Sequence, residues 1–190
     1  MGLPPVTTAP TIWTIGHSTR SNEDFLALLS AHKIAQLVDV RRFPGSRRYP
    51  HFHSDALAHS LTEAGLIYRH EPNLGGRRAA RPDSPNMGWK NASFRGYADY
   101  MHTEEFQEAL ETLIADATPS RTVIMCAEAV PWRCHRSLIA DRLLTNGWDV
   151  WHIMGPSQVQ QHRLTSFAVR QGDRLLYPTP MDEEAPPRLF

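Results

Sequence analysis

The chain has 190 residues, of which 41% are hydrophobic, and its 20 basic and 20 acidic residues give a formal net charge of zero. This length and composition indicate one globular domain with a buried core, and the balanced charge excludes a uniformly basic nucleic-acid-binding protein. The sequence has no run of about 18 apolar residues and begins without the pattern of a secretory signal, so we expect a soluble cytoplasmic protein that does not bind a membrane.

The first part of the chain predicts three strands alternating with two helices. Residues 1–10 are expected to form a flexible leader. Runs of β-branched and apolar residues then predict strands over 11–17, 35–40 and 66–72. A capping box at 21–24 is expected to open one helix, and Ser54 is expected to cap a second helix that ends near Gly65.

After a long irregular passage, the second part of the chain continues the alternation. Helices are predicted over 96–101, 103–117 and 136–146, with strands over 121–126 and 148–154. This order predicts a single α/β domain over 11–155, with about five mainly parallel strands and helices on both faces. Residues 156–190 are expected to form an extension, either packed on the domain or partly disordered, with a short helix near 158–170.

The charges are unevenly distributed along the chain. Residues 36–95 hold nine Arg and one Lys against five acids, whereas 96–116 hold six acids and no Lys or Arg. Forked guanidinium groups hold phosphate or carboxylate oxygens in pairs, so the loop 41–53, with Arg41, Arg42, Arg47 and Arg48, predicts an anion-binding surface. A solvated charged loop in an arginine-rich protein is the alternative.

The chemically notable residues follow the ends of the predicted strands. They form four clusters, at 16–20, 39–42, 69–71 and 126–128. In an open parallel sheet, ligands bind beyond the carboxyl ends of the strands. The sequence therefore predicts a binding or catalytic pocket at that edge.

Several motifs resemble a bacterial family known as domain of unknown function 488. They are TIGHSTRS, LVDVRRFPGSRR, NLGG, FRGYADYM and MCAEAVPWRCHRSLIAD, and the resemblance covers roughly residues 12–154. It implies a compact Rossmann-like α/β domain and no settled activity. The residues that match the family pattern are Gly16, His17, Ser18, Asp39, Arg41, Pro44, Gly96, Tyr97, Cys126, Glu128, Cys134, His135 and Arg136.

Cys126 has two interpretations. A thiol at a strand end can become a nucleophile when a helix start and arginines favour its thiolate. The loops of cysteine phosphatases, however, need an Arg six positions after the Cys, where this chain has Trp132. The alternative is a small core residue that completes a buried strand.

The second cysteine opens further alternatives. Cys126, Glu128, Cys134, His135 and His17 are candidate metal ligands, but no paired CxxC or HxxxH motif supports them. The adjacent Cys134 and His135 would also face different directions once a helix has begun, so no metal site is expected. A disulfide between the cysteines is not expected in a reducing cytoplasm.

Glu128 is the main catalytic candidate. Partnered by His135 or Arg136, its carboxylate would act as a general base or orient a ribose hydroxyl. A structural ion pair with a neighbouring arginine is the alternative. His17 and Asp39 are the other acid–base candidates, and for each of them a purely structural hydrogen bond or ion pair is the competing interpretation.

Together these features predict an enzyme that binds a phosphorylated ligand, either a nucleotide or a nucleic-acid end. One alternative is a non-catalytic module that binds nucleic acid or nucleotides through phosphate contacts, and another is a thiol or metal sensor using Cys126 and Cys134. Neither a cofactor nor an oligomeric state follows from the sequence. The residues expected to contact the ligand are Ser18, Arg41, Arg42, Arg47, Tyr97, Trp132, Arg133, His135 and Arg136.

Overall fold

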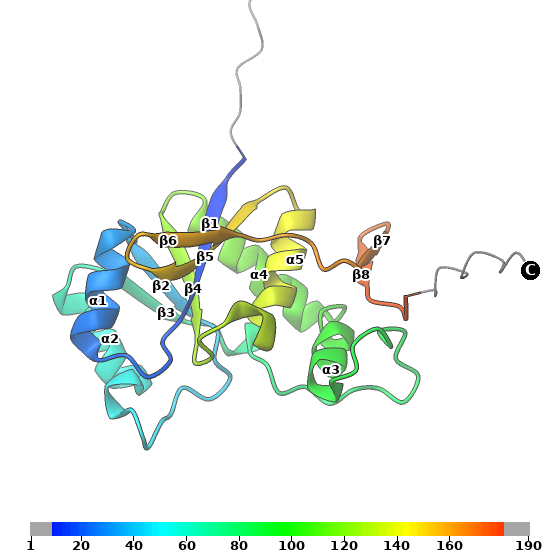
Figure 1. Ribbon diagram of the computed structural model, residues 1–190, viewed down its shortest axis with the longest axis horizontal. Helices are drawn as coiled ribbons and strands as arrows, with labels where there is room; N and C mark the ends of the chain where they lie inside the picture. The colour runs from blue at the N-terminus through cyan, green and yellow to red at the C-terminus, as the bar shows by residue number, and fades with distance from the viewer. Residues whose placement is uncertain (1–8, 181–190) are drawn as a thin grey trace, which may run out of the picture.

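The computed structural model describes residues 9–180, which contain one six-stranded sheet and a separate two-stranded hairpin (Figure 1). The sheet order is β3-β2-β4-β1-β5-β6, in which β1 to β5 run parallel and β6 is antiparallel to β5. The strands are β1 (Thr11–Gly16), β2 (Gln36–Asp39), β3 (Ile67–His70), β4 (Thr122–Cys126), β5 (Asp149–Gly155), β6 (Gln158–Gln161), β7 (Val169–Gln171) and β8 (Arg174–Leu176). The predicted α/β fold with a mainly parallel sheet is confirmed.

Helices cover both faces of the sheet, as the sequence predicts (Figure 1). Adjacent residues of a buried strand point to opposite faces, so Val123 and Met125 join one apolar cluster with α1 and α2, while Ile124 and Cys126 join the other with α3, α4 and α5. The helices are α1 (Asn22–Ala31), α2 (Ser54–Glu63), α3 (Ala92–Tyr100), α4 (Glu104–Ala117) and α5 (Arg136–Thr145), with 3-10 helices η1 (Pro50–Phe52), η2 (Pro72–Leu74) and η3 (Pro131–Arg133).

Three local predictions are wrong. The helix expected near 158–170 is absent from the described residues, because 158–161 pair with β5 as β6 and 169–171 form β7 of the hairpin. Ser54 is the first residue of α2 rather than its cap, a position that His53 occupies. α3 begins at Ala92, because the side chain of Asn91 accepts a hydrogen bond from the Ser93 amide at 2.8 Å and caps the helix four residues before the predicted start at 96.

A buried chain of hydrogen bonds ties the segment after β5 to the sheet. The Thr14 hydroxyl lies 2.8 Å from His152 Nδ1, and His152 Nε2 lies 3.0 Å from His162 Nδ1. His162 Nε2 in turn lies 2.8 Å from Asp141 Oδ1, and the Tyr177 hydroxyl donates to Asp141 Oδ2. Because Asp141 only accepts, the chain runs in one direction, with each histidine carrying its proton on Nε2.

Acid should destabilise the fold through two buried histidines. Burial and nearby positive charge lower the pKa of His152 to about 3 and that of His17 to about 4. The pKa of a histidine in the unfolded chain is about 6.5, so below this pH His17 and His152 become protonated in the unfolded chain while they stay neutral in the folded protein. The free energy of unfolding therefore falls as the pH drops from about 6.5 to 4, by up to about 1.4 kcal/mol per pH unit for each histidine.

Urea denaturation at several pH values measures this slope. His152→Gln should make it shallower, whereas the same change at His59, whose side chain is 74% exposed, should leave it as in the wild type. Stability that stays constant between pH 6.5 and about 5 would contradict the neutral, buried state of both groups.

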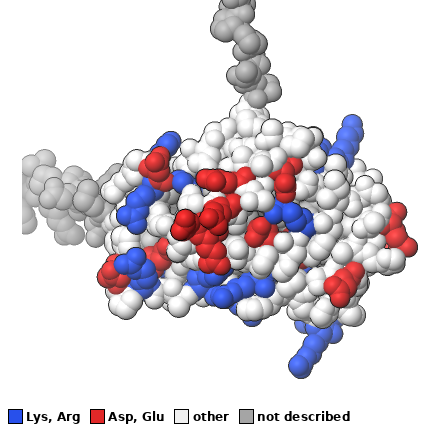
Figure 2. All heavy atoms as spheres, turned by 180° about the vertical axis from the view of Figure 1, so that it is seen from behind, with Lys and Arg blue, Asp and Glu red and all other residues white. Residues whose placement is uncertain are grey.

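The acidic segment predicted from the sequence forms one region of the surface. It becomes α3 and α4, and Glu104, Glu105, Glu108 and Glu111 on α4 are exposed. Figure 2 shows acidic side chains gathered at the centre of the face seen from behind the view of Figure 1. This face repels anions, so an anionic ligand is expected to approach elsewhere.

Two sequence predictions concern residues that lie partly outside residues 9–180. The flexible leader expected over 1–10 is described only at residues 9 and 10, and residues 181–190 of the expected C-terminal extension are not described. Among the described helices, none has the length and apolar character required to cross a membrane.

Candidate functional site

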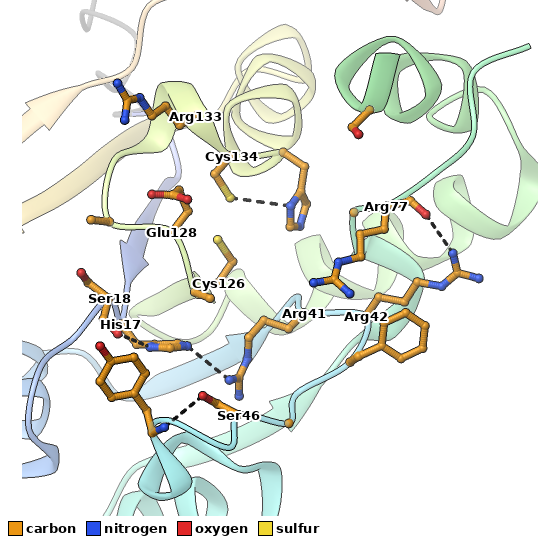
Figure 3. Close-up of a pocket in the computed structure, with 18 of the residues that line it drawn as sticks. His17, Ser18, Arg41, Arg42, Ser46, Arg77, Cys126, Glu128, Arg133 and Cys134 are labelled. Carbon is orange, nitrogen blue, oxygen red and sulfur yellow. Dashed lines mark hydrogen bonds between the residues drawn. The ribbon is translucent and has the colours of Figure 1, made fainter. Parts of the chain in front are cut away.

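A cavity of about 660 Å³ opens where β1, β2 and β4 end (Figure 3). Its volume lies within the usual range of small-molecule sites, about 300–1,000 Å³. The predicted site residues that line it are His17, Ser18, Arg41, Arg42, Tyr97, Cys126, Glu128, Arg133 and His135. The predicted site residues that do not line it are Asp39, Arg47, Trp132 and Arg136.

The loops after β1 and β4 are joined at the base of the cavity. The backbone amide of His17 donates to the Cys126 carbonyl at 2.9 Å, and that of Ser18 donates to the Ala127 carbonyl at 3.0 Å. Gly16 makes this approach possible, because a Cβ atom there would lie only 1.9 Å from the Glu128 carbonyl oxygen. The close pairing of the two loops therefore requires glycine at this position.

Gly16→Ala should lower the free energy of unfolding by about 1–3 kcal/mol or more, because the added methyl forces the two loops apart. Gly155→Ala is the matched control at the end of another strand, since a Cβ there would meet its nearest atom, in Gln158, at 3.6 Å. Urea denaturation of both variants compares them directly. Equal costs at the two positions would show that the loop contact is not as tight as described.

His17 is buried and both of its ring nitrogens are occupied. Nδ1 donates to the Ser18 carbonyl at 2.9 Å, which leaves Nε2 to accept from the Arg41 guanidinium at 3.3 Å. The ring stacks on Phe52 with a centroid distance of 4.1 Å. Burial, together with the charge of Arg41, lowers the pKa of His17 to about 4, so the ring is neutral near pH 7 and holds Arg41 in place. Its predicted part in catalysis stays a prediction.

Asp39 lies beneath Arg41 and does not reach the cavity. Its side chain is fully buried and accepts from Arg41 Nε at 2.8 Å, from Arg41 Nη2 at 2.6 Å and from the Arg41 amide at 3.1 Å. The Tyr68 hydroxyl donates to the same carboxylate. Asp39 is thus placed to orient Arg41 rather than to contact a ligand, unlike the direct catalytic contact that the sequence predicts.

Arginines dominate the charge of the cavity. Five of them line it, namely Arg41, Arg42, Arg48, Arg77 and Arg133, whereas Glu128 is the one carboxylate in the lining. Arg41 is paired with Asp39, but no carboxylate of residues 9–180 lies within ion-pair distance of the other four. The potential in the cavity is therefore positive.

Arg77 has an unusual backbone conformation beside Arg42. Its φ of 61° lies in the left-handed region, which costs a non-glycine residue on the order of 1 kcal/mol or more. Arg42 Nη1 donates to the Arg77 carbonyl at 3.1 Å, so the strained turn also fixes the side chain of Arg42. Figure 3 shows Arg41, Arg42 and Arg77 on the same side of the cavity.

The two cysteines lie close together at the inner end of the cavity with Arg136 behind them. Arg136 is 1% exposed, and its Nε lies 3.1 Å from Cys126 Sγ while its amide lies 3.5 Å from Cys134 Sγ. Burial raises the pKa of Cys126. Burial also opposes ionisation of Cys134, yet the hydrogen bond from Cys126 and the charge and amide of Arg136 bring the pKa of Cys134 down to about 6. Within the described residues both cysteines are free thiols, without a disulfide.

The expectation that Cys134 and His135 face different directions is wrong. α5 begins at Arg136, so Cys134 and His135 precede the helix and their side chains do not diverge. Cys134 Sγ lies 3.6 Å from His135 Nδ1, and the two Sγ atoms and one ring nitrogen of His135 all lie within 4.8 Å of one another. Cys126, Cys134 and His135 are therefore the residues of this cavity that are arranged to hold a metal ion.

Glu128 lines the cavity with an exposed side chain. Its carboxylate makes no hydrogen bond or ion pair with the residues described, and Arg136 donates instead to its backbone carbonyl at 2.5 Å. Neither the partnership with His135 or Arg136 nor the structural ion pair considered from the sequence is present. The carboxylate is thus available to a ligand, and its catalytic role stays a prediction.

Three predicted binding residues have other positions. Arg47 is exposed in the turn outside the cavity, and Trp132, which is 57% exposed on η3, faces a different hollow beside Trp89. Tyr97 touches the cavity but is 1% exposed, with its hydroxyl donating to the Leu74 carbonyl at 2.7 Å. Tyr97 is therefore a core residue whose edge forms part of the wall.

Several residues that line the cavity were not predicted from the sequence, among them Phe43 and Arg77. Phe43 is 64% exposed and lines the cavity, with the Arg42 guanidinium 5.4 Å from its ring. Its position between arginines and a Pro-Gly turn is the only signal in the sequence. Arg77 comes from the irregular passage before α3, where no periodicity indicates which side chains point inward.

The family described as "Domain of unknown function DUF488" has a model that matches residues 21–143, which is more than half of the chain. No curated protein and no solved structure matches the chain. The matched range includes the loop of Arg41 and Arg42, the end of β4 and the start of α5, which together build most of the cavity. The chain therefore belongs to the DUF488 family.

Proposed function

We propose that the cavity binds a phosphorylated small molecule, best a nucleotide, and that the protein is an enzyme acting on that ligand. The observation that carries the proposal is the lining of five arginines and one carboxylate around about 660 Å³ at the carboxyl ends of parallel strands. Anions are the ligands that such a lining attracts, and a nucleotide fits this volume.

The arginines are prepared to hold phosphate oxygens. Arg41 is fixed by Asp39 and His17, and Arg42 is fixed by the Arg77 carbonyl, so little side-chain entropy is lost when they bind. A guanidinium presents two parallel N–H groups to a phosphate, which favours this group over a single-point anion. The hydroxyls of Ser18 and Ser46 also line the cavity and add neutral donors.

Phe43 is the reason that we expect the cavity to prefer a nucleotide to inorganic phosphate. Its exposed ring stands beside the arginines and would stack on a base while the phosphates lie among the guanidinium groups. Stacking of a base on an aromatic side chain stabilises binding by about 1–3 kcal/mol. Phe43, rather than Tyr97 or Trp132, is the aromatic side chain that we assign to the base, because Tyr97 is buried and Trp132 lies outside the cavity.

A non-catalytic module that binds nucleic acid is the second candidate, supported by the excess of positive charge over 36–95. A long polyanion needs an extended basic track, whereas here the arginines surround a cavity and a neighbouring face is acidic. A short oligonucleotide that binds more tightly than ATP, with a steep dependence on salt and without turnover, would favour this second candidate.

The proposal predicts that ATP binds at low salt and that Arg42→Ala with Arg77→Ala weakens binding by roughly 100-fold or more, since each charged hydrogen bond contributes about 1.5–3 kcal/mol. Isothermal titration calorimetry at two salt concentrations measures the effect. Arg47→Ala is the matched control, because Arg47 lies on the same loop as Arg42 but outside the cavity. Absence of ATP binding at low salt, or an equal loss in the control, would refute the proposed surface.

A further inference from the structure

We infer that Cys126, Cys134 and His135 form a binding site for a divalent transition-metal ion, with zinc as the best fit and the fourth coordination position open to the cavity. This inference does not depend on the phosphorylated ligand. The three ligand atoms, two Sγ and one ring nitrogen of His135, lie within 4.8 Å of one another, and all three residues line the cavity.

The spacing of Cys134 and His135 matches what zinc requires, and Cys126 lies within 4.8 Å of both. Zn–S bonds of about 2.3 Å and Zn–N bonds of about 2.0 Å place tetrahedral ligand atoms roughly 3.4–3.8 Å apart. Cys134 Sγ and His135 Nδ1 are 3.6 Å apart. Two thiolates and an imidazole select zinc over magnesium or calcium, which prefer oxygen ligands.

The orientation of His135 is set for a metal on Nδ1. Its Nε2 lies 3.2 Å from the Val40 carbonyl, which only accepts, so Nε2 carries the proton and Nδ1 presents a lone pair toward the sulfur atoms. Metal-bound histidines usually donate their second N–H to a carbonyl or a carboxylate in this way. Position 76 lies next to His135 Nδ1, and a Cβ atom at this position would lie only 2.9 Å from that nitrogen. Because residue 76 is glycine, no side chain covers Nδ1 from this direction.

Arg136 supports the thiolates without occupying the metal position. Its Nε and its amide donate to Cys126 Sγ and Cys134 Sγ from the protein side, and its remaining groups bond to Thr14 and the Glu128 carbonyl. Two thiolates, one guanidinium and one Zn²⁺ sum to a single positive charge, so the site stays cationic and adds to the attraction of anions.

The open side distinguishes this site from a structural zinc site. Structural sites have four protein ligands, whereas catalytic sites have three and leave one position to water or substrate. Here Cys126, Cys134 and His135 face the cavity, and Figure 3 shows the two sulfur atoms directed toward the same space. A fourth ligand would therefore come from the cavity.

The test uses the full chain, reduced by a phosphine and freed of metal by a chelator, with its two thiols counted before titration. Co²⁺ serves as the first probe because thiolate ligation gives a charge-transfer band and four-coordination gives intense visible bands. We expect one Co²⁺ per chain with both features, and their loss when one equivalent of Zn²⁺ is added. Metal-free, fully reduced protein that shows no charge-transfer band with Co²⁺ would overturn the inference.

Variants assign the ligands. Cys134→Ser and His135→Ala should each weaken metal binding by more than about 100-fold. Loss of a residue that only hydrogen-bonds to a metal ligand weakens binding by about 10-fold to 100-fold, so a larger effect identifies a direct ligand. His17→Gln is the matched control in the same cavity and should keep the cobalt spectrum, because its nitrogens bond to Ser18 and Arg41. A spectrum that survives His135→Ala, or that is lost equally in His17→Gln, would contradict the assignment. His135→Ala keeps both thiols, so the test remains decisive if Cys134→Ser does not fold.

Discussion

Replacement of Arg136 by methionine is expected to lower the free energy of unfolding by about 3–5 kcal/mol, the usual cost of removing one partner from a buried charged network. The Arg136 side chain is 1% exposed and donates to Cys126 Sγ, Thr14 Oγ1 and the Glu128 carbonyl. Methionine fills a similar volume but donates nothing. The loss would leave buried acceptors unsatisfied and would remove the positive charge beside the thiol pair.

Arg142→Met is the matched control on the same helix. Arg142 is half-buried and donates to the Gln107 side chain at 3.3 Å, so its loss should cost about 1 kcal/mol. Urea denaturation with unchanged m-values gives both numbers. If the Arg136 variant were as stable as the control variant, Arg136 would not be the structural centre of the site.

Glu128→Gln is expected to reduce turnover of the proposed ligand by about 100-fold to 10,000-fold, the usual contribution of a general base. The melting temperature should stay near that of the wild type, because the Glu128 side chain is exposed and unpaired within residues 9–180. Affinity for the anion should be kept or raised slightly, since the variant removes the one carboxylate from the lining of the cavity.

Mass spectrometry of a panel of nucleotides and other phosphorylated compounds, incubated with each protein, follows substrate loss. Calorimetry with the compound that is consumed gives its affinity. Glu71→Gln is a control carboxylate change outside the cavity, where Glu71 pairs with Arg69. Equal turnover by Glu128→Gln and wild-type protein would show that the carboxylate is not the base.

The strands and the site edge were predictable because their signals are local. β-branched and apolar runs mark β1 to β5, and the residues that follow a parallel strand must meet at one edge. The edge strand β6 was not predictable, because the polar run Gln158–Gln161 becomes a strand only through its pairing with β5. Pairing between segments leaves no periodic pattern in so short a run.

The details of the site depended on irregular segments and on long-range contacts. α5 begins at Arg136, as the sequence predicts, so the shared direction of Cys134 and His135 is set by the irregular turn before the helix, where no periodic pattern indicates side-chain directions. Phe43 and Arg77 come from irregular segments, whose positions are set by contacts such as the close approach of Gly75 to Arg42. Local patterns carry no information on such contacts.

A crystal of the protein soaked with tungstate locates the oxyanion site, because this phosphate analogue is identified by its anomalous scattering. We expect tungstate in the cavity, within hydrogen-bond distance of at least two of Arg42, Arg48 and Arg77, and its loss from crystals of Arg42→Ala with Arg77→Ala. Tungstate bound at arginines outside the cavity, with the cavity free of it, would show that the cavity is not the anion site.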